Sequence, residues 1–141
     1  MKKKLMIILL IILIVIGALG AAAYFVLGGK SEEKSEAKKS IDEIVASSVD
    51  VEEITTNLKS DNIIRLAIKL ETDSDKSKEE LEKRDFQVKD AVISLLADTN
   101  ANEIEGDKGK ETFKKELKEK LNSYLQEGKV EKVYITSFNL Q

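Results

Sequence analysis

The chain has 141 residues, 23 of them basic and 26 acidic, and it contains no cysteine, histidine, proline or tryptophan. Without cysteine it can form neither disulfide bonds nor thiolate sites, and without histidine it lacks the commonest general base and metal ligand. Composition therefore argues against an enzyme. We expect no catalytic residues, no cofactor-binding residues and no metal ligands.

The first predicted element is the stretch from Leu5 to Leu27, which holds 23 residues without a charge. At about 1.5 Å of rise per residue, a helix of this length exceeds the roughly 30 Å hydrocarbon core of a bilayer. A helix also pairs its own backbone N–H and C=O groups, which is necessary because the hydrocarbon of lipid offers them no hydrogen-bond partners. The stretch predicts a single transmembrane helix over residues 5–27, preceded by a basic tail over residues 1–4.

The charges on either side of this stretch predict its direction. The cluster Lys2-Lys3-Lys4 precedes it, and basic clusters of this kind stay in the cytoplasm. After Leu27 the chain carries 20 basic and 26 acidic residues, a net charge of −6, and its lysines are dispersed. We expect a cell-membrane protein with a cytoplasmic N-terminus and an extracytoplasmic domain. We expect no nucleic-acid partner, because an acidic domain gains no net counterion release from phosphate.

A cleaved secretory signal is the alternative interpretation of the same stretch. Its elements are a basic start, an apolar centre and Ala21-Ala22-Ala23, which resembles a cleavage site. The apolar run is longer than an ordinary signal core and continues past this site through Tyr24-Phe25-Val26-Leu27. That length favours an uncleaved anchor.

The anchor also contains two candidate helix-packing residues, Gly17 and Ala21. Small residues four apart let transmembrane helices approach each other closely. The alternative is that small residues are simply common near the outer end of an anchor.

A polar linker is predicted over residues 28–40. Gly28-Gly29 end the apolar helix, and the run from Lys30 to Ser40 is charged and rich in serine, without apolar periodicity. The alternative is a helical stalk, since Glu, Lys and Ala are good helix formers. Residues 41–141 then form one small domain, which begins with Ile41–Val45 as either a short helix or an entry strand.

A β-hairpin with one buried face is predicted next. Val49–Lys59 is strand-like, and Ser60-Asp61-Asn62 is a turn signal. Ile63–Thr72 alternates apolar and polar residues, which is typical of a half-buried strand.

Two helices are predicted after the hairpin. The first covers about two dozen residues from a capping box, Ser77-x-x-Glu80, and has Phe86 and Ile93 beside its apolar stripe. Residues 99–109 are predicted to form a polar loop. The second helix covers about residues 110–126, with Gly128 as the residue that follows its C-terminus.

The last predicted strand, Val130–Leu140, is apolar on both faces. Val133 and Ile135 are expected on one face, and Phe138 and Leu140 on the other. Such a strand is expected in the centre of a sheet or covered on both sides. The order β-β-α-α-β predicts an α+β fold with two helices packed on a small sheet.

Some polar residues partly resemble chemical sites. Carboxylates gather in two groups: Glu79, Glu80 and Glu82, then Asp98, Glu103 and Glu105. Exposed carboxylates lack the burial that raises a pKa for acid catalysis, so we interpret both groups as solvated surface. Residues 98–103 lack the spacing of a calcium-binding loop, and Gly106-x-x-Gly109-Lys110 lacks the spacing of a phosphate-binding loop.

The layout of the chain and a series of later motifs resemble a known family. The motifs are Leu70-Glu71-Thr72, Glu82-Lys83-Arg84-Asp85, Val88-Lys89-Asp90, Leu95-Leu96 and the segment from Gly128 to Phe138. In this order they resemble the flagellar basal body-associated FliL family, most strongly over Leu66 to Gln141.

This resemblance implies an extracytoplasmic domain similar to stomatin-type domains and a non-enzymatic role in flagellar motility and chemotaxis. The implied partners are the motor stator complex, the basal body and the cell membrane. It also implies a homo-oligomeric ring around the stator that supports stator engagement and torque for swimming or swarming. It carries over no catalytic residues and no cofactor. The alternative is a membrane-anchored extracytoplasmic sensor or adaptor of an unrelated pathway.

Overall fold

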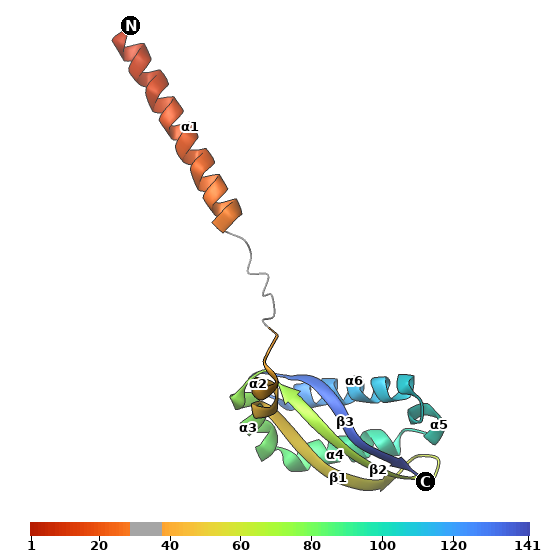
Figure 1. Cartoon of the computed structure of the whole chain (residues 1–141). Coiled ribbons are helices and arrows are strands. Elements are labelled where there is room, and N and C mark those ends of the chain that lie inside the picture. Colours follow the sequence, from red (N-terminus) through yellow and green to blue (C-terminus); the bar gives the residue numbers. More distant parts are fainter. Residues whose placement is uncertain (29–37) are drawn as a thin grey trace. The chain divides into compact units, whose positions relative to one another are not determined.

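The computed structural model describes residues 1–28 and 38–141, and of residues 22–28 it describes the backbone alone. Most of the predicted linker, residues 28–40, lies outside the described residues. The chain forms two compact units, Met1–Lys39 and Ser40–Gln141. Figure 1 shows both units, and each is described by itself.

The described part of the first unit forms the helix α1, Lys2–Gly28, which includes the whole predicted apolar stretch. All large apolar side chains from Leu5 to Leu19 are exposed. Between Lys2 and Ala21 the helix is long and apolar enough to cross a membrane. A helix that is apolar on every side suits lipid rather than water, which is consistent with membrane anchoring.

The second unit begins with a short helix, α2, Ile41–Ala46. The hydroxyl of Ser40 accepts a hydrogen bond from the N–H of Glu43 at 3.2 Å, and the Glu43 carboxylate accepts one from the N–H of Ser40 at 2.8 Å. This capping box satisfies two amides at the helix N-terminus. It explains why the segment is a helix, a choice that the apolar pattern of the sequence left open.

A three-stranded antiparallel sheet follows, in the order β1-β2-β3. Its strands are β1, Ser48–Asn57; β2, Ile63–Thr72; and β3, Val130–Leu140. The first two form the predicted hairpin, whose turn has a positive φ of 65° at Asp61. Aspartate tolerates this left-handed conformation better than most residues. The predicted bounds of β2 and β3 are confirmed, and β1 is shifted by one or two residues.

The prediction that Val130–Leu140 is central or covered on both faces is wrong, because β3 lies at one edge of the sheet that the described residues form. Its register with β2 shifts at two places. Each shift inserts an extra residue into β3 and exchanges the faces of the residues beyond it. Val133 and Ile135 therefore pack on the same core as Phe138 and Leu140. Packing of one face of β3 on the core is therefore enough to cover its apolar side chains.

The helix predicted from Ser77 consists of two helices, α3, Asp75–Lys83, and α4, Asp85–Ala97. The capping residue is Ser74 rather than Ser77, since the Ser74 hydroxyl accepts the N–H of Ser77 at 3.2 Å. The backbone turns at Arg84, whose side chain donates to Glu80 before the break and to Gln87 after it. Apolar periodicity continues across Arg84, which is why the sequence predicted one helix.

The predicted polar loop, residues 99–109, contains a further helix, α5, Ala101–Ile104, and the start of α6, Asp107–Tyr124. Ile104 is fully buried and fixes α5 to the core. A Cβ at Gly109 would overlap the backbone carbonyl of Glu103, so glycine allows α6 to pass close to α5. The order is thus β-β-α-α-α-α-β after α2, with more helices than the predicted β-β-α-α-β. The mixed helix-and-sheet class is confirmed.

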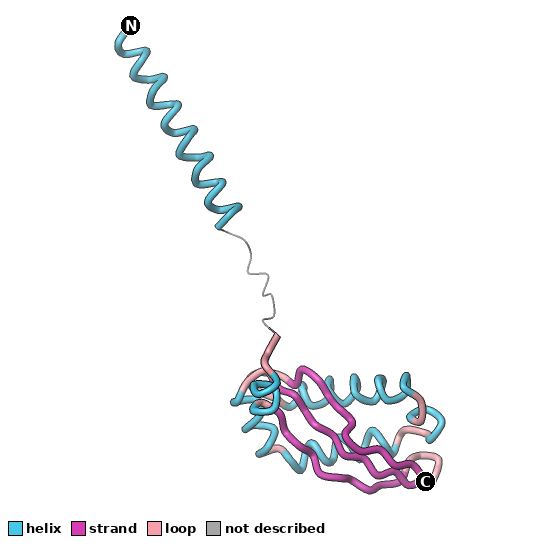
Figure 2. The backbone as a smooth tube through the Cα atoms, in the orientation of Figure 1, coloured by secondary structure: helices cyan, strands magenta, loops and turns pink. Residues whose placement is uncertain are grey.

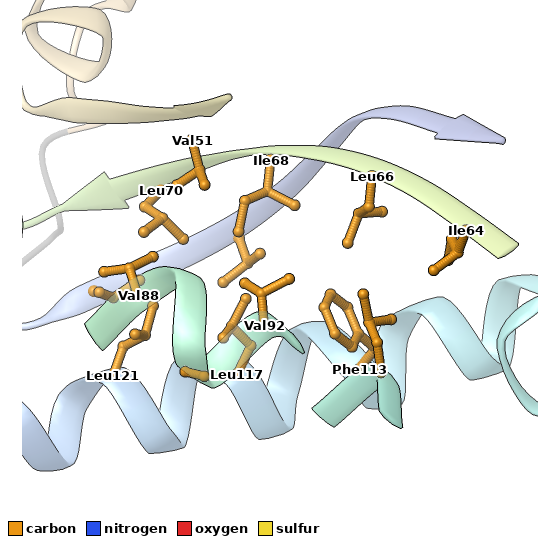
Figure 3. Close-up of a cluster of buried hydrophobic side chains, with 14 of the residues drawn as sticks. Val51, Ile64, Leu66, Ile68, Leu70, Val88, Val92, Phe113, Leu117 and Leu121 are labelled. Carbon is orange, nitrogen blue, oxygen red and sulfur yellow. The ribbon is translucent and has the colours of Figure 1, made fainter. Parts of the chain in front are cut away.

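The core lies between the sheet and helices α4 and α6, which cover the same face of the sheet (Figures 1 and 2). Figure 3 shows side chains of β2 pointing toward those of the two helices. The labelled core residues are Val51, Ile64, Leu66, Ile68, Leu70, Val88, Val92, Phe113, Leu117 and Leu121. The opposite face of the sheet is polar, and there Lys69 pairs with Asp50 at 2.9 Å.

Candidate functional site

The first carboxylate group of the sequence is used structurally. Glu80 accepts hydrogen bonds from the Arg84 guanidinium and from the backbone N–H groups of Gln126 and Glu127. Partial desolvation alone would raise the pKa of Glu80, but the Arg84 and backbone hydrogen bonds outweigh it and hold the pKa below its usual value. A carboxylate with a lowered pKa cannot serve as a general acid near neutral pH. Its neighbours Glu79 and Glu82 are exposed on α3.

A second carboxylate, Asp73, holds the same loop between α6 and β3. It accepts the Ser77 hydroxyl at 2.5 Å and the N–H of Lys129 at 3.0 Å. Burial would raise the pKa of Asp73, and the hydrogen bonds from Ser77, Lys129 and Ser74 more than offset this and lower it. Gly128, with φ +70°, lies against Ser77 and Asp73. The loop between α6 and β3 is therefore held against α3 and the residues before it by two carboxylates, those of Asp73 and Glu80.

Two of the remaining candidates for chemistry, Glu103 and Lys110, also have structural partners. Glu103 accepts the N–H of Asn100 at 2.7 Å and so caps α5, and Lys110 donates to the carbonyl of Glu105 at 2.7 Å. Lys110 also lies 4.3 Å from the centre of the Phe138 ring. Among the described residues no group of three or more Asp or Glu side chains is placed to hold a metal ion. The structure brings Asp98, Glu103 and Gly109 together in the lining of one hollow of about 940 Å³ beside α6. Lys110 and Glu105 do not line it.

The candidate packing residues Gly17 and Ala21 lie four apart on α1, and both are exposed. A Cβ at Gly17 would meet no atom within 4 Å. Their face of the helix is therefore sterically open to a second transmembrane helix. Packing at Gly17 and Ala21 stays a prediction.

Two surfaces of the folded unit have features of contact sites. The first is the α6–β3 groove, a depression of about 360 Å³ between α6 and the edge strand β3. Its lining residues are Glu111, Lys114, Lys115, Lys118, Glu131, Lys132, Val133 and Tyr134. Four of these are lysines and two are glutamates, so the groove has a net positive lining. Apolar contacts are offered by Val133, Tyr134 and the aliphatic stems of the lysines.

The ring of Tyr134 is held in place at this groove by Glu71. The Tyr134 hydroxyl donates to the Glu71 carboxylate at 2.7 Å. This hydrogen bond, together with burial and the charge of Glu71, raises the pKa of Tyr134, so the phenol stays protonated and remains a donor. Glu71 is only 5% exposed, and it is held on the polar face of the sheet by this bond. The bond therefore fixes the aromatic lining of the groove.

The second surface is the β1–α4 flank, which we define as Glu52 and Glu53 of β1 with Phe86, Asp90 and Ile93 of α4. Phe86 is 71% exposed and Ile93 42% exposed. They lie seven residues apart and thus on one side of the helix. β1 packs beside α4. The pKa of Lys89, which lies between Phe86 and Ile93 in the sequence, is raised mainly by its hydrogen bond to Asp85 and also by the charge of Glu52. Sequence periodicity placed Phe86 near the core stripe and missed its exposure.

These observations favour binding by surface contact over acid–base chemistry. The pKa values of two carboxylates, Asp73 and Glu80, are lowered, and both carboxylates accept hydrogen bonds from backbone amides. The two surfaces combine exposed aromatic groups with charged rims, which is a composition typical of interfaces between proteins.

Comparisons with known proteins identify the family that this chain resembles. The family model described as flagellar basal body-associated protein FliL matches residues 48–141. The chain is 96% identical over 141 residues to "Flagellar protein FliL" of Bacillus subtilis (strain 168), with all of both chains covered. It is 34% identical over 77 residues to "Flagellar protein FliL" of Aquifex aeolicus (strain VF5), which is 55% of this chain and 48% of that relative. The family match starts at the first residue of β1 and covers the sheet and α3 to α6.

Proposed function

Because this chain belongs to the FliL family of flagellar basal body-associated proteins, we propose that it supports the engagement of motor stator units and the torque that they deliver in swimming or swarming. FliL is a family of flagellar accessory proteins and not a known enzyme family. The observation that carries the proposal is the extent of the match. It covers β1 to β3 in the family model and the whole chain in the Bacillus subtilis relative.

The proposed location is the cell membrane, with residues 1–4 in the cytoplasm and the unit Ser40–Gln141 outside it. The support is the apolar surface of α1 and the cluster of three lysines that precedes it. A cleaved signal would instead give a mature chain that begins near Tyr24. Mass spectrometry of the protein from washed membranes distinguishes the two, because retention of Met1 to Leu27 is expected only for an anchor.

The proposed mechanism is mechanical. Several copies would surround one stator unit as a ring and hold its extracytoplasmic segments in the active arrangement. A ring needs an anchor, a folded unit and two contact surfaces on each copy. α1 can supply the anchor, and the α6–β3 groove and the β1–α4 flank are candidates for the two contact surfaces.

A similarity of the folded unit to stomatin-type domains is also proposed, and superposition of Ser40–Gln141 on such a domain tests it.

Deletion of the gene tests the proposed role in motility. We expect swimming speed to fall more steeply with medium viscosity in the deletion strain than in the parent, and swarming to be reduced. Complementation with the full chain restores both. Unchanged speed at every viscosity, with the flagella present, would contradict the proposal.

A further inference from the structure

The hollow of about 940 Å³ beside α6 is formed by three segments of the folded unit, and we call it the α4–α6 hollow. Its lining includes Leu95 and Asp98 at the end of α4, Asn102 of α5, and Thr112 and Glu116 on one side of α6. Both α4 and α5 pack on α6, and Figure 1 shows α5 beside the start of α6. The volume lies toward the upper end of the roughly 300–1,000 Å³ that is typical of sites for organic ligands.

The charges of the lining exclude two classes of ligand. It contains four carboxylates and two ammonium groups, a net charge of −2: Asp98, Glu103, Glu116, Glu119, Lys108 and Lys120. A phosphate or carboxylate ligand would be repelled by this excess of negative charge. Among the described residues, no group of three or more acidic side chains is placed to hold a metal ion. The charges therefore favour an uncharged organic ligand.

Several polar side chains of the hollow have no protein partner within the part of the chain that the structure describes. They are the carboxylates of Asp98 and Glu116, the amide of Asn102, and the ammonium groups of Lys108 and Lys120. All except the half-buried Lys120 are exposed, so water satisfies them in the free protein. A ligand that displaces this water must offer hydrogen-bonding groups of the matching kinds.

The required kinds are both donors and acceptors. A carboxylate only accepts hydrogen bonds, an ammonium group only donates them, and the amide of Asn102 does both. A protonated polyamine has donors alone and would be repelled by Lys108 and Lys120. A hydroxyl group is both a donor and an acceptor. A ligand that carries many hydroxyl groups is therefore the class that satisfies the whole lining.

The rest of the lining suits a ligand with an apolar face. Leu95 is half-buried and Phe113 is only 3% exposed, so both lie at the bottom of the hollow rather than at its rim. Gly106 and Gly109 leave the backbone at the start of α6 open to close approach. No side chain caps α6 at Gly106, so backbone N–H groups are additional donors. A sugar ring has this dual character, with C–H groups on its faces and hydroxyl groups around its edge.

We propose that the α4–α6 hollow binds an oligosaccharide. Asn102 and Glu116 bind its hydroxyl groups, and a ring face lies over Leu95. This inference goes beyond the proposed function, because saccharide binding does not require a motor. On a unit outside the membrane, the ligands within reach are the glycan chains of the cell envelope.

Calorimetric titration of the full-length chain in lipid nanodiscs, prepared without glycoside detergent, tests the proposal. The probes are the tetramer of N-acetylglucosamine, its monomer, spermidine and inorganic phosphate. We expect saturable binding of one tetramer per chain with a Kd of about 1 mM or below. The monomer is expected to bind at least about tenfold more weakly, because it fills only part of the hollow. Spermidine and phosphate are expected not to bind.

Three variants locate the binding site. Asn102→Ala and Glu116→Ala each remove hydrogen bonds to the ligand and are expected to weaken tetramer binding about tenfold. Thr112→Trp places a large ring in the hollow and is expected to abolish it. The matched controls are Asn139→Ala and Glu79→Ala, which are exposed positions outside the hollow and should leave Kd unchanged. All three test positions are exposed, so unchanged melting temperatures separate lost binding from lost folding.

The absence of saturable tetramer binding would overturn the proposal. Binding that Asn102→Ala, Glu116→Ala and Thr112→Trp all leave unchanged would also overturn it, because the ligand would then lie elsewhere. Tighter binding of spermidine or phosphate than of the tetramer would contradict the ligand class. Equal affinities for the tetramer and the monomer would contradict a site for a saccharide chain.

Failure of this inference can be distinguished from failure of the proposed function. If the tetramer does not bind while the deletion strain loses swimming speed under load, the saccharide site is wrong and the motor role stands. If the tetramer binds in the hollow while the deletion strain swims normally, the saccharide site stands and the motor role is wrong.

Discussion

Replacement of Gly128 by alanine is expected to destabilise the folded unit by disrupting the loop between α6 and β3. The backbone at Gly128 has φ +70°, a conformation that costs an L-residue with a Cβ about 1–2 kcal/mol. The new Cβ would also overlap the Ser77 hydroxyl and the Asp73 carboxylate. Moving these groups weakens hydrogen bonds at both, each worth about 1 kcal/mol. We expect a total loss of about 3 kcal/mol.

Urea unfolding of the full-length chain in detergent micelles, followed by tyrosine fluorescence, measures this loss. With a slope of about 2 kcal/mol per M, a loss of about 3 kcal/mol lowers the midpoint by about 1.5 M. The matched control is Gly106→Ala. A Cβ at Gly106 meets nothing within 4 Å, and its φ of −89° is open to any residue, so we expect a change of about 0.5 kcal/mol or less. Equal midpoints for Gly128→Ala and the natural chain would refute the reasoning.

Three further predictions follow from the core, the loop and the anchor. Leu117→Ala removes a fully buried side chain and is expected to cost about 2–5 kcal/mol in the same urea assay; a loss below about 1 kcal/mol would mean that α6 is not packed as described. The pKa of Asp73 is lowered in the folded state, so its stabilising effect is complete above its ordinary value of 3.8 and is lost as the pH falls through the lower folded value. Stability measured from pH 6 to pH 2 should therefore fall less steeply for Asp73→Asn than for the natural chain, and parallel curves would contradict this. Gly17→Leu should reduce crosslinking between copies in membranes if the small residues of α1 pack together, and unchanged crosslinking would remove that hypothesis.

The parts of the fold that the sequence predicted well are those with simple periodicity. β2 alternates apolar and polar residues along its whole length, and its bounds were predicted to the residue. α1 was predicted from uninterrupted apolarity. In both, every residue carries the same local signal, and no distant contact has to be known.

The parts that were missed depend on contacts between segments distant in sequence or on single backbone irregularities. The shifts of register in β3 exchange its faces, and nothing in the apolar pattern of Val130–Leu140 marks where they occur. The break at Arg84 leaves the apolar stripe intact. α5 is four residues long, and its signal was the pair Asn100 and Glu103, a capping box in which asparagine replaces the usual serine or threonine.

The candidate surfaces were harder to predict than the fold. Phe86 and Ile93 lie next to buried positions of α4, and only the packing of α4 on β1 decides that both remain exposed. The lysines of the α6–β3 groove come from two segments, and their proximity follows from the pairing of α6 with β3. Glu80 was predicted as a member of a capping box, but the bonds of Glu80 and Asp73 to the loop at residues 126–129 depend on tertiary structure.

The number of stator units at a motor under high load tests the central claim most directly. Fluorescent stator units are counted in the deletion strain, after complementation with the full chain, and after complementation with residues 1–39 alone, which carry α1 without the folded unit. We predict a reduced number in the deletion strain, recovery with the full chain and no recovery with residues 1–39. Equal numbers in all strains would contradict a role in stator engagement.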